Sequence, residues 1–153
     1  MSGQDLSGAL HPTTLMVVWA AAGLGLQWLW PLSFPDWQAL EWVSWGLLVP
    51  GVILVSWSLL ALVRAGTTTE HSKPTTRLVT TGPFRFSRNP LYAGITAILI
   101  GISLDGGNPY LLLLSLAFPL ALQRWTIRPE EAYLEREFGE AYRRYRSSVR
   151  RWV

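Results

Sequence analysis

Two short polar blocks near the carboxyl end hold the residues that could do chemistry. The first contains Arg88, Asn89 and Tyr92, on either side of a proline, and the second contains the adjacent carboxylates Glu130 and Glu131. Arginine and asparagine donate hydrogen bonds to carboxylates and phosphates, whereas carboxylates accept from amines, hydroxyls and transferable protons. The two blocks together indicate a site for a charged small molecule, provided that the fold brings them to one place.

The proline of the first block predicts a helix start. Pro90 suits a first helical position, because the N–H that it lacks would be unpaired there. Residues 91–93 would then present backbone N–H groups to an anion. An ordinary interpretation is also open, in which Arg88 anchors lipid headgroups, Asn89 caps the helix and Tyr92 is an interfacial aromatic residue.

Composition indicates that a membrane positions these blocks. Half of the residues are hydrophobic, only 15% are charged, and there are nine tryptophans among 153 residues. Uncharged runs occupy residues 14–32, 42–63, 91–104 and 110–123. The first two are long enough to cross a bilayer, which takes roughly 17–25 residues. The third is short, but a turn sequence at 105–109 joins it to the fourth, so the pair is expected to form a helical hairpin.

The basic residues set the expected orientation. All thirteen lysines and arginines fall in the middle loop or at the carboxyl end. The positive-inside rule therefore places residues 64–90, residues 124–153 and both termini in the cytoplasm. A group of tryptophans is expected at the opposite membrane surface: Trp28, Trp30, Trp37, Trp42 and Trp45. Residues 1–12 lack the basic stretch of a signal peptide, so no cleavable signal is expected.

The fourth run is expected to end in a separate amphipathic helix. Pro129 predicts a kink and a new helix that runs to about residue 147, with Glu130 and Glu131 in its first turn. Its apolar stripe consists of Leu134, Phe138, Ala141, Tyr142, Tyr145 and Val149. The predicted fold class is thus an all-α integral membrane protein with four transmembrane helices plus a cytoplasmic amphipathic C-terminal helix. The two carboxylates could also serve only to complement the helix dipole, and Arg124 could simply extend toward the headgroups.

Several function classes are disfavoured by what the sequence lacks. The chain has no cysteine and only two histidines, so thiolate chemistry is excluded and a metal site is not expected. Nothing in it resembles a module that reads nucleic acid, and the basic pI fits a membrane surface. A small four-helix membrane transporter stays open as an alternative, although the four runs lack the intramembrane carboxylate expected for proton coupling.

At the polar blocks the chain resembles the isoprenylcysteine carboxyl methyltransferase family, which is related to membrane phospholipid methyltransferases. The similar residues run from Gly82 to about Arg150 and include a Gly-Pro-aromatic start, Arg-x-Pro-x-Tyr-x-Gly at residues 88–94, and Glu130-Glu131. Many relatives carry histidine where this chain has Asn89, and asparagine cannot accept a proton there. The resemblance implies a single domain, with variable amino-terminal helices at 14–63 and a cofactor-binding core at 82–150.

The resemblance also implies a reaction: transfer of a methyl group from S-adenosyl-L-methionine to a lipid or lipid-linked acceptor. Arg124 and Glu131 are the expected catalytic residues, the first to hold an acceptor carboxylate and the second to take a proton from an amine or hydroxyl. The residues expected to bind the cofactor are Arg88, Asn89, Leu91, Tyr92, Gly94, Glu130, Glu131, Tyr142 and Tyr145. An NADPH-dependent membrane reductase of a sterol-like lipid is a second alternative, although such enzymes are usually much longer.

Two further expectations concern the setting of the protein. Arginine outnumbers lysine by twelve to one and the loops are short, which suggests a prokaryotic protein, so the membrane is expected to be the cytoplasmic one. The active site is expected to face the cytoplasm, where the positive-inside rule places both polar blocks. The identity of the acceptor and the oligomeric state stay open, although Gly23, Gly25, Gly46 and Gly51 could permit close approach between helices.

Overall fold

Helices make up the regular structure of the chain. The computed structural model describes residues 11–34, 38–66 and 77–152, so Trp37 and part of the middle loop lie outside the described residues. The elements are α1 (Pro12–Leu29), α2 (Gln38–Arg64), the 3-10 turn η1 (Gly82–Arg85), α3 (Pro90–Asp105), α4 (Pro109–Leu122), the π-helical turn η2 (Gln123–Ile127) and α5 (Arg128–Ser148). The described ranges contain no strand, and the all-α prediction is confirmed.

The predicted hairpin is formed by α3 and α4. Gly107 turns the chain between them with a φ of 60°, a conformation that glycine adopts without steric cost. Asn108 then caps α4, since its side chain accepts a hydrogen bond from the N–H of Leu111 at 2.9 Å. The same amide reaches the carbonyl of Gly23 in α1 at 3.4 Å. The turn therefore also ties the hairpin to the first helix.

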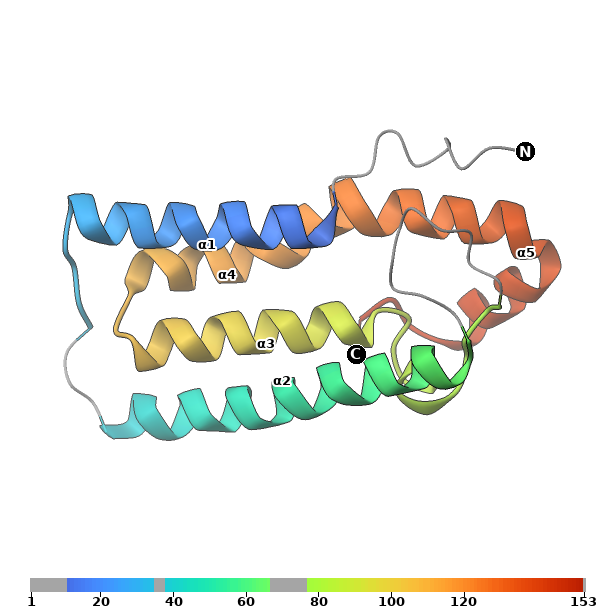
Figure 1. Cartoon of the computed structure of the whole chain (residues 1–153), viewed down its shortest axis with the longest axis horizontal. Coiled ribbons are helices and arrows are strands. Elements are labelled where there is room, and N and C mark those ends of the chain that lie inside the picture. Colours follow the sequence, from blue (N-terminus) through green and yellow to red (C-terminus); the bar gives the residue numbers. More distant parts are fainter. Residues whose placement is uncertain (1–10, 35–37, 67–76, 153) are drawn as a thin grey trace.

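The hairpin brings both polar blocks to one end of the helices. In Figure 1 the start of α3, the end of α4 and all of α5 lie on the right, whereas the hairpin turn lies on the left. The backbone N–H of Arg88 donates to the carbonyl of Arg150 at 2.9 Å, which joins the start of α3 to the chain that follows α5. Nη1 of Arg88, in the first block, lies 3.1 Å from Oε1 of Glu131, in the second, so the prediction that the two blocks meet is confirmed.

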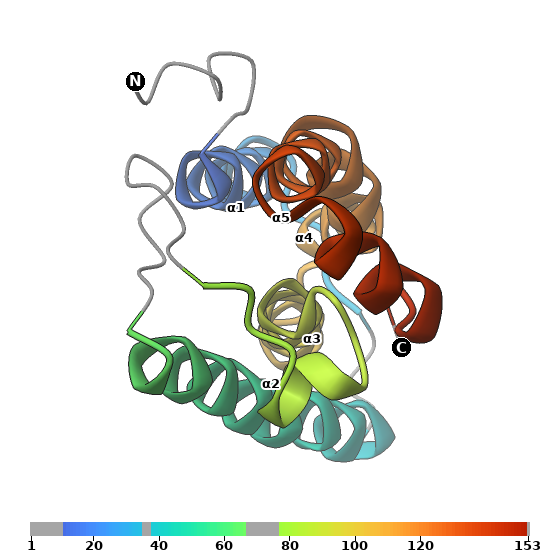
Figure 2. The ribbon, with the colours of Figure 1, turned by 90° about the vertical axis from the view of Figure 1, so that its right-hand side faces the viewer.

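Close packing between α2 and α3 depends on small residues. A Cβ atom added to Gly94 would lie 2.9 Å from the carbonyl oxygen of Gly51, and one added to Gly101 would lie 3.1 Å from that of Ser44. The hydroxyl of Ser44 donates to the Gly101 carbonyl at 2.9 Å, so the contact also satisfies a polar group within the apolar layer. Figure 2 shows α2 beside α3, and α1 beside α4.

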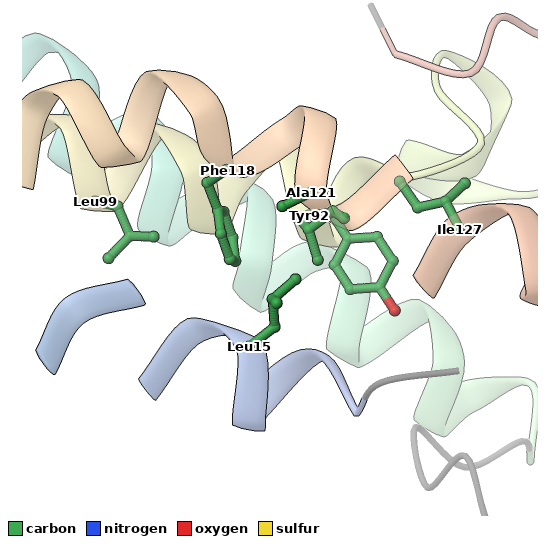
Figure 3. Packing of buried hydrophobic residues seen from close by; sticks show 7 residues of the cluster. Leu15, Tyr92, Leu99, Phe118, Ala121 and Ile127 are labelled. Carbon is green, nitrogen blue, oxygen red and sulfur yellow. The ribbon is translucent and has the colours of Figure 1, made fainter. Parts of the chain in front are cut away.

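The buried apolar residues lie between α1, α3 and α4 (Figure 3). Leu15 of α1 meets Leu99 of α3 and Phe118 of α4 in this cluster, and Ile127 extends it into the π-helical turn. Tyr92 also belongs to it, so one wall of the predicted site is continuous with the core. Close packing of this kind fixes the position of the Tyr92 ring, because a core side chain has little free volume around it.

The predicted bounds of the last helix are confirmed, since α5 begins at Arg128, with Pro129 in its first turn, and ends at Ser148, but the helix does not break at Pro129. The helix instead passes from α4 to α5 through η2, where the N–H of Arg128 donates to the carbonyl of Gln123, five residues earlier. A π-helical turn shifts the hydrogen-bond register, so the chain can pass a proline that lacks an N–H without ending the helix. One run of helical residues thus extends from Pro109 to Ser148.

The break lies instead within α5, at Gly139. This residue has φ 49° and ψ −119°, which no other residue type adopts readily, and it divides the predicted amphipathic helix into two pieces. An added Cβ at Gly139 would meet nothing within 4 Å, so the glycine is required by backbone conformation and not by packing. The kink redirects the second piece toward the start of α3, where Tyr142 and Tyr145 become buried.

Three helical stretches are long and apolar enough to cross a membrane: Pro12–Leu29, Ala39–Arg64 and Pro109–Ser148. The remaining helix of the hairpin, α3, is apolar but has only 16 residues. At about 1.5 Å per residue it extends roughly 24 Å, which is less than the hydrocarbon thickness of about 30 Å. Three spans are thus supported by length, and the fourth span and the orientation stay predictions.

The α2–α3 contact predicts a clear difference between two glycines of the same helix. We expect Gly51→Ala to lower the free energy of unfolding by about 1–3 kcal/mol, because its Cβ would lie 2.9 Å from Ile98 and 3.0 Å from the Gly94 carbonyl. Gly46→Ala is the control, since nothing lies within 4 Å of its added Cβ and alanine favours helix. Unfolding in detergent, followed by circular dichroism, measures both. Equal stability of the two variants would contradict the close packing.

Candidate functional site

A buried carboxylate lies between two guanidinium groups at the start of α3. Arg151 donates two hydrogen bonds to Glu131, from Nε to Oε1 at 3.0 Å and from Nη2 to Oε2 at 2.7 Å. Arg88 contacts the same carboxylate, with Nη1 3.1 Å from Oε1. The side chains of Arg88 and Glu131 are only 9% and 10% exposed, so solvent screens this pair weakly. We call these three residues the arginine–glutamate cluster.

The cluster leaves one donor of Arg88 unused. Its Nε is buried and has no hydrogen-bond partner within the described residues. A buried N–H without a partner is costly in free energy, so its presence calls for an explanation such as a ligand or a water molecule. With two guanidinium groups and one carboxylate, the cluster carries a net charge of about +1, which suits an anionic partner.

Two tyrosines of the second half of α5 line the same corner. The hydroxyl of Tyr142 lies 3.5 Å from Nη1 of Arg88, and its ring meets that of Tyr145 edge-on at 6.3 Å between centroids. Tyr145 donates its hydroxyl hydrogen to the carbonyl of Phe84 at 2.7 Å, which fixes η1 against α5. Of the two, Tyr142 is therefore next to the cluster, whereas Tyr145 holds the turn that precedes Arg88.

Tyr92 and Glu130 form a second polar contact between the two blocks. The Tyr92 hydroxyl lies 3.1 and 3.2 Å from the two carboxylate oxygens of Glu130 and donates to them. The ring of Tyr92 is buried in the core, as Figure 3 shows. Core packing therefore fixes the position of the hydroxyl that contacts Glu130. The two predicted carboxylates thus have different partners, since Glu130 pairs with a phenol and Glu131 with arginines.

Asn89 stands at the start of α3, but its side chain makes no capping hydrogen bond. It donates instead to the carbonyl of Arg151 at 3.0 Å. The N–H of Ala93 donates to the Asn89 carbonyl at 3.1 Å, so the last of the three predicted anion-binding N–H groups is used within the helix. The geometry favours a structural role for Asn89, in which its amide holds the chain that carries Arg151.

Among the other predicted site residues, Gly94 and Leu91 lie on α3 and Arg124 lies in η2. Gly94 faces α2, where an added Cβ would lie 2.7 Å from a methyl group of Val55, so its position favours packing over cofactor contact. Leu91 is half-buried in the first turn. Arg124 is exposed, as is its neighbour Trp125, whose ring lies 6.4 Å from that of Trp19. Arg124 therefore faces outward at the helix end, whereas Glu131 is buried.

The sequence analysis missed Arg151 and Gln123. Arg151 lies beyond the similar residues, in a basic stretch that is typical of a membrane surface, and no local pattern distinguishes it from Arg150. Its hydrogen bonds with Glu131 raise the pKa of its guanidinium above the ordinary value. Gln123 accepts a hydrogen bond from the indole of Trp152 at 3.4 Å. Only the folded chain reveals either contact, because 20 or more residues separate the partners.

Residues 40–141, which include α3, α4 and both carboxylates, match the family described as phospholipid methyltransferase. The match covers more than half of the chain. The chain belongs to the phospholipid methyltransferase family. This family includes the isoprenylcysteine methyltransferases, so the resemblance found at the polar blocks is confirmed. Membership in this family together with the long apolar helices identifies a membrane protein of a methyltransferase family.

Two proteins are similar to this member of the phospholipid methyltransferase family, and one of the two has a named activity. An uncharacterized protein of Haemophilus influenzae is 40% identical over 63 residues, which are 41% of this chain and 100% of that protein. A protein-S-isoprenylcysteine O-methyltransferase of Schizosaccharomyces pombe is 34% identical over 97 residues, which are 58% of this chain. The match spans 40% of the length of the fission yeast protein. Among solved structures, none matches the chain.

The burial of the arginine–glutamate cluster predicts a large stability difference between two substitutions in α5. We expect Glu131→Gln to lower the free energy of unfolding by about 3–5 kcal/mol, because it leaves buried guanidinium charge without its partner. Glu140→Gln is the control, since Glu140 pairs with Arg143 at 3.0 Å on the surface and such pairs contribute about 1 kcal/mol or less. Denaturant unfolding in detergent measures both. A loss for Glu131→Gln no larger than for the control would show that the cluster is not structurally important.

Proposed function

We propose that the chain is an S-adenosyl-L-methionine-dependent methyltransferase that modifies a lipid or lipid-linked acceptor at the cytoplasmic membrane surface. Family membership supports the reaction class. The single observation that carries the location of the site is the buried arginine–glutamate cluster, which lies where the two polar blocks meet. The active site is proposed to face the cytoplasm, because the basic residues gather at this end of the helices.

The polar groups present fit the cofactor. S-adenosyl-L-methionine has an amino-acid carboxylate, an ammonium group and ribose hydroxyls, so it needs both donors and acceptors. The unpaired Nε of Arg88 is a buried donor suited to the carboxylate. Glu130 offers carboxylate oxygens to an ammonium or a hydroxyl. The Tyr142 ring is only 1% exposed, so its proposed part is to contact Arg88. When bound, the cofactor supplies a methyl group on a positively charged sulfur.

Positioning supplies most of the catalysis in such a displacement, because the acceptor atom must lie in line with the methyl group and the sulfur. The chain contributes rigidity at this place: Tyr92 is fixed by the core, and Arg88 and Glu131 are fixed by each other. Helix α3 is in turn held by close contact with α2. Tyr92 and Glu131 of the proposed site thus lie on packed helices, whereas Arg88 and Arg151 lie just outside the helices and are held there by hydrogen bonds.

The acceptor is proposed to reach the site from the lipid. Arg124 is exposed at the helix end beside an exposed Trp125, as expected for side chains near headgroups. A carboxylate acceptor is already nucleophilic, and Arg124 would orient it by charge-assisted hydrogen bonds. An amine or hydroxyl acceptor needs a proton acceptor, for which Glu131 was expected. Since Arg151 occupies both oxygens of Glu131, the geometry favours a holding role for Glu131.

Calorimetric titration of the detergent-purified protein tests the proposal. We expect saturable binding of S-adenosyl-L-methionine and S-adenosylhomocysteine and none of NADPH. Glu130→Gln should weaken the binding by about 10- to 100-fold, which is the range for a hydrogen bond to a charged group. Glu140→Gln, a surface glutamate of the same helix, is the matched control and should bind like the natural chain. Binding of NADPH alone would contradict the proposal and favour a reductase.

The role of Arg124 gives a separate prediction on turnover. We expect Arg124→Ala to reduce methyl transfer to a carboxylate acceptor, such as an S-farnesyl cysteine derivative, while cofactor binding stays unchanged. Loss of one charge-assisted hydrogen bond in the transition state corresponds to at least about a tenfold lower kcat/KM. Arg128→Ala is the control, because Arg128 is also exposed and lies one turn further along. Transfer of labelled methyl groups measures both. Normal turnover by Arg124→Ala would refute the assigned role.

A further inference from the structure

A short segment after α5 runs back to the start of α3. We call residues 149–152 the return segment. It begins with an extended residue, since Val149 has φ −125° and ψ 133°. Its carbonyls are then held by three groups that come directly before α3. The N–H of Arg88 donates to the Arg150 carbonyl at 2.9 Å, and the Ser87 hydroxyl and the Asn89 amide donate to the Arg151 carbonyl at 3.2 and 3.0 Å.

The side chains of the return segment reach two other parts of the site. Arg151 donates two hydrogen bonds to the buried Glu131. Trp152 packs against the core cluster, and its indole donates to the side chain of Gln123 in η2 at 3.4 Å. Four residues thus connect the start of α3, the first turn of α5 and the π-helical turn. These are the elements that carry most of the predicted site residues.

We propose that Arg151 is a positioning residue that keeps the Nε of Arg88 available to the cofactor carboxylate. This inference rests on the proposed function. An arginine and a carboxylate ordinarily pair through two parallel hydrogen bonds. In this protein Arg151 forms that two-nitrogen pair with Glu131, so Arg88 reaches Glu131 with Nη1 alone. The Nε of Arg88 stays buried and has no hydrogen-bond partner among the described residues.

Removal of Arg151 would free the second oxygen of Glu131. Arg88 could then turn and form the pair that Arg151 forms now, through Nε and Nη2, and its Nε would no longer be free for a ligand. Asn89 takes part in the same arrangement from the backbone side, because its amide holds the carbonyl of Arg151. The asparagine at this place therefore acts through the return segment, and no proton transfer is required of it.

Two ligands separate positioning from general structural support. S-adenosylhomocysteine has the amino-acid carboxylate, whereas 5′-methylthioadenosine has the same nucleoside and a sulfur atom but no carboxylate. We expect Arg151→Met to weaken the binding of S-adenosylhomocysteine by at least about tenfold, the effect of one charged hydrogen bond, and that of methylthioadenosine by less than about twofold. Methionine is used because it retains an apolar stem of similar length. Calorimetry in detergent gives both affinities.

Arg150→Met is the matched control. Arg150 is the exposed neighbour of Arg151 and has the same charge, and only its backbone carbonyl takes part in the contacts above. Both ligands should bind this variant as they bind the natural chain. Arg151→Lys keeps the charge but cannot form the two-nitrogen pair, so its affinity for S-adenosylhomocysteine should lie between those of the natural chain and Arg151→Met. If Arg151→Met does not fold, the affinity of Arg151→Lys for the two ligands tests the inference instead.

The outcomes distinguish the inference from the proposed function. Equal weakening of both ligands by Arg151→Met would overturn the positioning role, since that pattern is expected of a general structural loss. Unchanged affinity for S-adenosylhomocysteine in Arg151→Met and Arg151→Lys would overturn it as well, with the proposed function intact. Failure of the natural chain to bind S-adenosylhomocysteine would overturn the proposed function, and the role of Arg151 with it.

Discussion

The buried carboxylate of Glu131 constrains the rest of the structure. A charge out of contact with water is very costly unless it is paired and hydrogen-bonded, and here the two partners come from distant parts of the chain. Arg88 precedes the hairpin and Arg151 follows α5. The pairing therefore requires that the hairpin return the chain to the same end and that α5 turn back. The proposed site lies at this corner, where the buried charge is paired.

The helices provide this geometry by close packing and by one kink. Small residues at Gly51, Gly94 and Gly101 let α2 and α3 approach closely, and the core between α1, α3 and α4 fixes Tyr92. Gly139 then bends α5 with a positive φ, so that Tyr142 and the return segment reach Arg88. The apolar parts are ordinary membrane-type packing, whereas the buried charges are costly local features. Such costs are typical of functional sites.

The sequence predicted the parts that depend on local patterns. The run lengths, the Asp-Gly-Gly-Asn-Pro turn and Pro90 indicated the hairpin and the helix start, and the structure confirms both. The meeting of the two polar blocks also followed, because the hairpin returns the chain to the end at which α3 begins. The direction of the bend at Gly139 could not be predicted, since a glycine in a helical pattern permits many conformations. The partnership of Arg151 with Glu131 is a tertiary contact without a local signal.

An experimental structure of the protein with bound S-adenosylhomocysteine would test the central claim most directly, namely that the arginine–glutamate cluster forms the cofactor site. The account predicts that the amino-acid carboxylate of the ligand lies about 3 Å from Nε of Arg88, with Arg151 still paired to Glu131. A ligand bound away from the start of α3 would contradict the account. So would a complex in which Arg88 pairs with Glu131 through two nitrogens while the ligand carboxylate contacts other groups.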